Sequence, residues 1–199
     1  YFPATNQYMA CWANWAYVAR SDDNRFFMAA SDHLGMGADI NVYEYAPGDK
    51  EVRKRIDVDR LLSWKPDQYT DGKLHGQMGI LSNGVLWGAT QYGVPPDSKG
   101  YAAGYKGSWL FSYDLKTGEG QNWGSPLPSN SMPCFTVDTR RGLLVATAGE
   151  GGFLCWDCNA KQVKFAGRPP NGWIWWARSL LCDDATGIFW GMDGSEKPH

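Results

Sequence analysis

Residues 143–162 read LLVATAGEGGFLCWDCNAKQ, and this stretch has two counterparts earlier in the chain. Residues 26–51 read FFMAASDHLGMGADINVYEYAPGDKE, and residues 85–119 begin VLWGATQYG and continue, after a loop, GSWLFSYDLKTGE. Each copy has a β-rich run ending in small residues, a glycine-containing turn or loop, a second run with aromatic side chains, and a polar turn. A fourth copy begins at Ile188 (IFWGMDG). Internal repetition on this scale decides the fold before any single residue does.

The composition favours an all-β protein built from hairpins. The 199 residues include 11 Trp, 10 Tyr, 8 Phe and 24 Gly. Aromatic residues favour strands, and glycine supplies the positive φ angles that tight turns require. The length fits a single domain, residues 1–199, that is large enough to bury a sizeable core.

Turn signals such as Asn83-Gly84, Arg141-Gly142 and Thr186-Gly187 separate short apolar runs. A short helix is predicted at residues 57–64, with Asp57 as its cap. Strands are predicted at residues 15–19, 26–30, 41–45, 74–81, 85–90, 108–114, 134–138, 143–148, 153–157, 179–183 and 188–192. The charged segment 50–60 (KEVRKRIDVDR) is interpreted as a solvated face.

The spacing of equivalent turns, 58 residues from Gly84 to Gly142 and 45 from there to Gly187, is close to the length of a four-stranded propeller blade. We therefore predict a β-propeller with about three and a half to four blades in this chain. Because a propeller removes sheet edges by closing into a ring, we expect part of a larger propeller, or else a compact four-bladed ring. A β-sandwich is the alternative, but it does not explain the repeat.

The charge pattern argues against two classes of partner. With 19 basic and 21 acidic residues, the net charge of −2 gives no electrostatic footprint for nucleic acid. A membrane is not expected either, because no apolar run approaches the roughly 20 residues of a spanning helix.

One segment points to a family. Residues 56–93 read IDVDRLLSWKPDQYTDGKLHGQMGILSNGVLWGATQYG, with the step YTDGKLH at residues 69–75. The helix-like stretch, this step and a strand ending in Ala-Thr resemble the propeller-type polysaccharide lyases of the ulvan lyase-like family and their uncharacterised relatives. The preceding Ser31-Asp32-His33 and the turn at residues 113–118 (YDLKTG) fit the same pattern.

The resemblance implies cleavage of a uronic-acid polysaccharide by β-elimination on one face of the propeller. His75 would be the base or the carboxylate-binding group, Arg178 would neutralise the uronate, and Tyr92 or Tyr69 would supply a phenolic acid or base. The implied catalytic residues are His75, Tyr92 and Arg178, and the implied substrate-binding residues are Lys73, Gln91, Tyr69 and Trp173. A polysaccharide partner implies an extracellular or periplasmic location.

Two positions depart from the family pattern. Gln91 stands where a second histidine is expected, and Ala148-Gly149 stands where a tyrosine is expected. A non-catalytic propeller that serves as a binding or structural module is therefore the alternative function. A third hypothesis is a building block that assembles with other chains through unpaired blade edges.

The remaining motifs have simpler interpretations. Cys155 and Cys158 have the spacing of a zinc or redox pair, but no second pair or nearby histidine completes a zinc site. Asp183-Asp184 could bind calcium, although adjacent acids in a turn usually face water. We therefore expect no cofactor. His33, like most lone histidines on strands, is interpreted as structural, and most tryptophans are expected to pack between blades.

Overall fold

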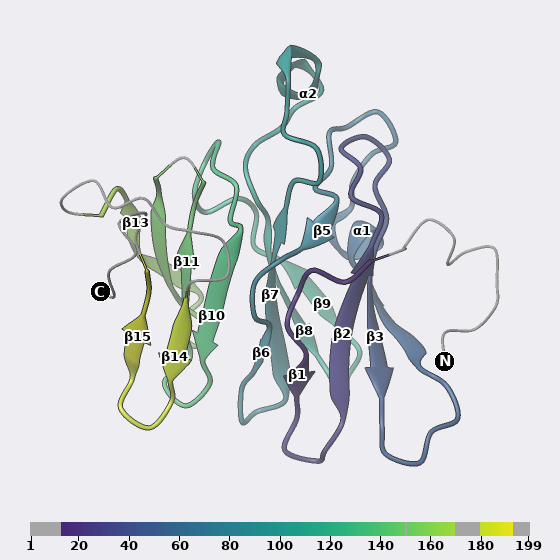
Figure 1. The fold of residues 1–199 in the computed structure, drawn as a ribbon, viewed down its shortest axis with the longest axis vertical. Helices are drawn as coiled ribbons and strands as arrows, with labels where there is room; N and C mark the ends of the chain where they lie inside the picture. The colour runs from purple at the N-terminus through teal and green to yellow at the C-terminus, as the bar shows by residue number, and fades with distance from the viewer. Residues whose placement is uncertain (1–12, 150, 170–179, 193–199) are drawn as a thin grey trace.

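The computed structural model describes residues 13–149, 151–169 and 180–192. In this part of the chain, three antiparallel sheets follow one another and a two-stranded hairpin comes last (Figure 1). The first sheet has the order β1 (Ala19–Arg20), β2 (Phe26–Ser31), β3 (Ile40–Tyr45) and β4 (Arg53–Asp57). The second has β5 (Lys73–Leu74) and β6 (Gly79–Ile80), both paired with β7 (Val85–Gln91), then β8 (Leu110–Asp114) and β9 (Gly120–Asn122).

The third sheet repeats the same antiparallel order along the chain. It consists of β10 (Cys134–Asp138), β11 (Leu143–Thr147), β12 (Phe153–Asp157) and β13 (Gln162–Gly167), and the hairpin consists of β14 (Leu181–Asp183) and β15 (Ile188–Trp190). The first strands contact one another in turn, β1 with β6, β6 with β10, and β10 with β14. The described part of the chain is therefore all-β and forms a partial propeller of three blades and a half-blade, as the repeat predicts.

The repeat extends to an irregularity in the strands. The pairing of β3 with β4 shifts register between Val42 and Tyr43, and the pairing of β12 with β13 shifts between Cys155 and Trp156. In both blades, the register shifts directly after the third residue of the third strand. Such bulges increase the local twist of a sheet, so blades one and three twist their outer strands at the same point.

A single apolar core joins the blades. Fully buried side chains from different sheets meet in it, among them Phe27, Leu86, Phe111 and Phe135. Burying a side chain of this size contributes about 1.5–3 kcal/mol relative to leaving it in water. Contacts between blades therefore hold the partial ring together.

The predicted strands are confirmed at the centre of each blade and differ at the margins. The predicted strand at residues 15–19 is reduced to β1, and the one at 74–81 is divided into β5 and β6. Within the segment 50–60, interpreted as a solvated face, residues 53–57 form β4, which exposes Arg53 and Lys54 and buries Ile56. The predicted helix is confirmed as α1 (Val58–Leu62), where Asp57 accepts a hydrogen bond from the Arg60 amide.

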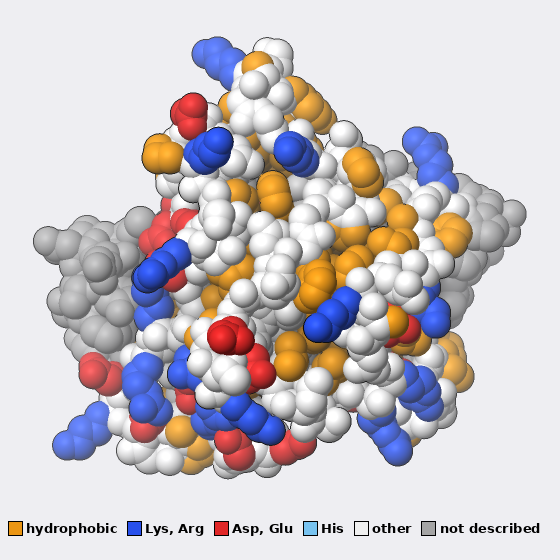
Figure 2. Space-filling view, turned by 180° about the vertical axis from the view of Figure 1, so that it is seen from behind, with side chains coloured by type: hydrophobic (Ala, Val, Ile, Leu, Met, Phe, Trp, Pro, Cys, Tyr) orange, Lys and Arg blue, Asp and Glu red, His pale blue; other side chains and the backbone are white. Residues whose placement is uncertain are grey.

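The two ends of the blades differ. The tight turns gather at the lower edge in Figure 1, whereas the upper edge carries longer loops, including the one with α2 (Ser98–Ala102). Seen from behind, Lys and Arg are interspersed with Asp and Glu along the lower edge (Figure 2). Among the described residues, neither helix has the length or apolar character to span a bilayer.

Candidate functional site

The sequence-predicted residues of blade two lie at the upper end, where β5 begins and β7 ends. Lys73 lies opposite Gln91 in the pairing of β5 with β7. Leu74 points into the core, so the alternation of a strand turns Lys73 to the other face. His33 comes from the loop after β2 and joins them, although 40 residues separate it from Lys73.

The loop that carries His33 is held by hydrogen bonds to the carboxylate of Asp32. Asp32 accepts hydrogen bonds from the amides of Leu34 and Asp39, at 2.9 and 2.8 Å. His33 has a φ angle of 66°, and its amide donates to the carbonyl of Gly72 at 3.0 Å. A left-handed conformation is uncommon for a side chain of this size and costs about 1 kcal/mol or more, so the fold holds His33 in a defined position.

Two glycines let three backbone segments meet beneath His33. A Cβ at Gly72 would lie 2.1 Å from the Leu34 carbonyl oxygen, and one at Gly93 would lie 2.2 Å from the His33 carbonyl oxygen. Any side chain at either position would displace backbone atoms. The loop after β2 is therefore fixed against the segments that precede β5 and follow β7 in blade two.

Lys73 is a buried cation between two rings. Only 8% of Lys73 is exposed, its Nζ lies 2.8 Å from His33 Nε2, and it lies 5.4 Å from the ring centre of Trp15. The Trp15 and His33 rings are 4.8 Å apart. An ammonium group only donates hydrogen bonds, so His33 Nε2 accepts and its ring is neutral. Burial, and then the charge of Lys73, lower the pKa of His33.

Gln91 and Tyr92 end the neighbouring strand. Gln91 is 8% exposed, and its Oε1 has no hydrogen-bond partner among the described residues. The Tyr92 ring lies 6.5 Å from that of Tyr105, and its hydroxyl lies 3.8 Å from the place a Cβ would take at Gly149. Tyr92 therefore reaches toward blade three, near the position where the family pattern has its own tyrosine.

His75 joins the inner strands of blades two and three. Its Nδ1 lies 2.6 Å from the carbonyl oxygen of Pro133. A carbonyl can only accept, so Nδ1 carries a proton and, in the neutral ring, Nε2 is the basic nitrogen. The ring is 8% exposed. The backbone of blade three thus sets the orientation and tautomer of His75.

Tyr69 lies in the base of the α2 loop. Its hydroxyl donates to the carbonyl of Val94, its ring contacts that of Tyr105 at 5.2 Å, and burial raises its pKa. Beside it, Asp71 is fully buried and accepts a hydrogen bond from the Thr90 hydroxyl. Burial raises the pKa of Asp71 to about 7.

The structure therefore brings together Lys73 and Gln91 and adds two residues that sequence reasoning did not assign to the site. These are Trp15 and His33. A signal for His33 is its position just after the second strand of its blade, as Tyr92 comes just after the second strand of the next. The predicted residues Arg178 and Trp173 lie outside the described residues.

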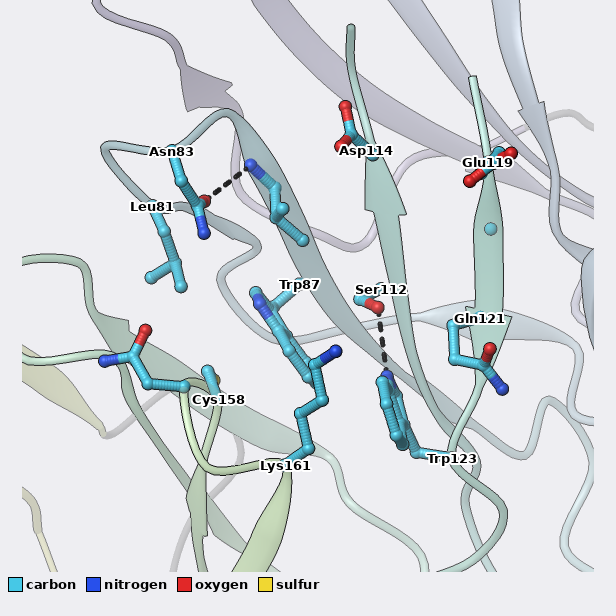
Figure 3. A pocket seen from close by; sticks show the side chains of 13 residues that line it. Leu81, Asn83, Trp87, Ser112, Asp114, Glu119, Gln121, Trp123, Cys158 and Lys161 are labelled. Carbon is cyan, nitrogen blue, oxygen red and sulfur yellow. Dashed lines mark hydrogen bonds between the residues drawn. The ribbon is translucent and has the colours of Figure 1, made fainter. Parts of the chain in front are cut away.

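A pocket opens at the other end of β7. It has a volume of about 380 Å³ and lies between blades two and three, beside the turns (Figure 3). Trp87 and Trp123 form one wall, and Cys158 and Lys161 come from the β12–β13 turn. Trp87 in this pocket and Gln91 in the cluster around Lys73 are four residues apart on β7, which corresponds to roughly 13 Å.

One group of metal-ligating residue types occurs in the described part of the chain. Ligand atoms of Asp138, Cys182 and Asp184 lie within 4.8 Å of one another. Asp138 pairs with Arg141 at 2.9 Å, and Asp184 accepts from the Thr139 hydroxyl at 2.7 Å. Burial raises the pKa of the Cys182 thiol to about 12. These groups connect the half-blade to blade three through hydrogen bonds.

Comparison with known proteins shows the fold alone. No family model matches the sequence, and no curated protein matches it. Among solved structures, the chain is similar to the computationally designed Ika4 protein, with a TM-score of 0.54 and 12% identity over 94% of this chain and 89% of that one. It is also similar to YCF48 bound to a D1 peptide, with a TM-score of 0.46 and 16% identity over 83% of this chain. The chain spans 43% of that structure's length.

Proposed function

We propose that this chain is a carbohydrate-active propeller that binds a uronic-acid polysaccharide at the cluster around Lys73 and cleaves it by β-elimination. The observation that carries the proposal is the buried Lys73 ammonium, held between His33 and Trp15. A carboxylate that reaches this ammonium would gain a charge-assisted hydrogen bond where water screens little.

The uronate ring would be oriented by the groups around that cation. Trp15 offers an aromatic face for the apolar side of a sugar, and Gln91 offers an amide for its hydroxyl groups. The buried Oε1 of Gln91 is a hydrogen-bond acceptor without a partner among the described residues. A hydroxyl donor from the substrate would satisfy it.

The elimination itself needs a base and an acid. In the proposed step, His75 Nε2 takes the C5 proton, the C5 electron pair forms the C4–C5 double bond, and the C4–O bond breaks. The leaving oxygen takes a proton from the Tyr92 hydroxyl. Lys73 stabilises the negative charge that develops on the carboxylate as C5 loses its proton. The hydrogen bond that His75 Nδ1–H donates to the Pro133 carbonyl supports this assignment, because it leaves Nε2 as the basic nitrogen.

A binding module without catalysis is the second candidate. Gln91 favours it, because an amide stands where the family pattern has a histidine, and an amide moves no proton near neutral pH. Both candidates use the same cluster and the same ligand class. They differ only in whether the sugar chain is cut.

The test combines a cleavage assay with a binding assay. The protein is incubated with ulvan and other uronate polymers, and the ultraviolet absorbance of the new double bond is followed. Catalysis predicts that His75→Ala and Tyr92→Phe lose about 100-fold or more in rate, whereas Tyr45→Phe, at a partly exposed tyrosine on β3, is unchanged. Binding without product, abolished by Lys73→Met, supports the second candidate. No binding by any uronate polymer refutes both.

A further inference from the structure

We propose that the tryptophan-lined pocket between blades two and three binds an uncharged pyranose unit of a glycan. The pocket lies at the turn end of β7, opposite the cluster around Lys73, and shares no residue with it. The proposal is independent of the uronate site. It rests on the aromatic wall, the mixture of polar groups at the rim, and the conformation of Lys161.

The aromatic wall is rigid. The Trp87 and Trp123 rings stack at 5.8 Å with an angle of 18°, and Trp156 lies against Trp123 at 5.9 Å. The Trp123 Nε1–H donates to the Ser112 hydroxyl at 3.0 Å, which fixes the rotation of that ring (Figure 3). A preformed indole wall offers a platform for the apolar face of a sugar at little entropic cost.

The polar groups of the pocket include both hydrogen-bond acceptors and hydrogen-bond donors. Asp114 and Glu119 can only accept hydrogen bonds, whereas Lys161 can only donate them. The Trp87 side chain can also only donate. Trp87 is 2% exposed, and its buried Nε1 has no hydrogen-bond acceptor among the described residues. Leaving such a group unsatisfied costs about 1–3 kcal/mol.

This mixture of hydrogen-bond donors and acceptors favours one class of ligand over others. A hydroxyl group both donates and accepts, so a ring with several hydroxyls can use the carboxylates and the donors together. A carboxylate ligand would face Asp114 and Glu119, and a cationic ligand would face Lys161. The charges therefore disfavour both ionic classes and favour an uncharged sugar.

Lys161 holds its place through an unusual backbone conformation. Its φ angle is 57°, in the left-handed region where glycine and asparagine are the common residues. Asp157 fixes the turn by accepting from the amides of Asn159 and Ala160, at 3.0 and 2.8 Å. The ammonium lies 5.7 Å from the ring centre of Trp123. The turn thus places a donor at the mouth of the pocket at the cost of local strain.

The binding would be non-covalent. Cys158 lines the pocket, but burial raises the pKa of its thiol to about 12. A thiol is nucleophilic as its thiolate, and at neutral pH almost none is present. Cys158 contributes packing to the pocket and no reaction.

The experiment follows the indole N–H signals of the 11 tryptophans by NMR during titration with neutral hexaoses, namely cellohexaose, xylohexaose, mannohexaose and laminarihexaose. A pocket signal, identified by its loss in Trp123→Phe, should shift with at least one of them. Trp123→Ala and Lys161→Gly should each weaken binding about threefold to tenfold, as expected for one stacking contact or hydrogen bond. Glycine suits the φ angle at 161, so the turn is retained.

Matched controls lie outside the pocket. Trp190→Ala removes an exposed tryptophan on β15, and Lys65→Ala removes an exposed lysine in the loop after α1. Both should leave affinity unchanged.

Three results would overturn the proposal. They are no shift with any of the neutral hexaoses at millimolar concentration, shifts with oligogalacturonate or choline alone, and neutral-sugar affinity that survives Trp123→Ala. Lys73→Met should leave this binding intact, because Lys73 lies at the other end of β7. Failure here is therefore distinguishable from failure at the uronate site.

Discussion

Asp71 makes the stability of this protein depend on pH in a direction that can be derived from its burial. The carboxyl group is fully buried, and its pKa is raised from 3.8 to about 7 in the folded chain. The folded state therefore holds a proton that the unfolded state has released between these two values. Unfolding then releases a proton, so the free energy of unfolding falls as pH rises through this window.

The size of the effect follows from the pKa difference. At about 1.4 kcal/mol for each pH unit, raising the pKa from 3.8 to about 7 corresponds to roughly 4 kcal/mol. Asp71→Asn removes the titration and retains an oxygen for the Thr90 hydroxyl. The variant should be near wild type in stability at pH 4 and more stable by up to roughly 4 kcal/mol at pH 8.

Urea unfolding, followed by tryptophan fluorescence at intervals between pH 4 and 8, measures the difference between wild type and variant. Taking this difference cancels other titrating groups, such as Asp59, whose pKa burial raises to about 8. Asp67→Asn, at an exposed aspartate in the same loop, is the control for the substitution itself. A constant difference between Asp71→Asn and wild type across the range would refute the reasoning.

Three further predictions follow from single contacts. Gly93→Ala should lower the free energy of unfolding in urea by about 1–3 kcal/mol, because its Cβ would collide with the backbone of His33. In the control Gly167→Ala, the nearest neighbour of the new Cβ is the Phe165 side chain at 3.4 Å, so the change should be less than about 0.5 kcal/mol. Lys73→Met should raise the pKa of His33 in an NMR titration, because it removes a neighbouring positive charge; an unchanged pKa would contradict the contact. Asp184→Ala should accelerate amide hydrogen exchange in the β14–β15 hairpin but not in β2 and β3, since it removes bonds to blade three.

Sequence reasoning located the inner and central strands because their burial leaves a readable pattern. Strands β10 and β12 match their predicted bounds, and both carry buried apolar residues at alternate or successive positions. The outer strands gave no such signal. β13 is exposed at five of its six positions, and β9 reads only GQN. An outermost strand is held by ladder hydrogen bonds that any sequence can make, so its residues carry little information about it.

The candidate site was predictable only within one segment. Lys73 lies in the YTDGKLH step, and Gln91 and Tyr92 follow Ala-Thr at the end of the next long strand, so the resembling segment 56–93 indicated all three. His33 comes from blade one, and its contact with Lys73 depends on how two blades pack, which no local pattern states. The tryptophan wall shows the same limit, because β7, β12 and the segment after β9 each contribute one ring.

The repeat explains how one scaffold can carry different chemistry at each blade. The second strands of the three blades end at Ser31, Gln91 and Thr147, and the positions two residues beyond them hold His33, Gly93 and Gly149. The positions are equivalent in the repeat, but only blade one places a ring there, and of the three residues only His33 has a positive φ angle. Gly93 leaves space for the backbone of His33, and Gly149 leaves space for the Tyr92 hydroxyl. Blades two and three therefore have no side chain at the positions that a residue of the preceding blade approaches. The polar cluster therefore arises from differences between the repeats, whereas their shared features maintain the fold.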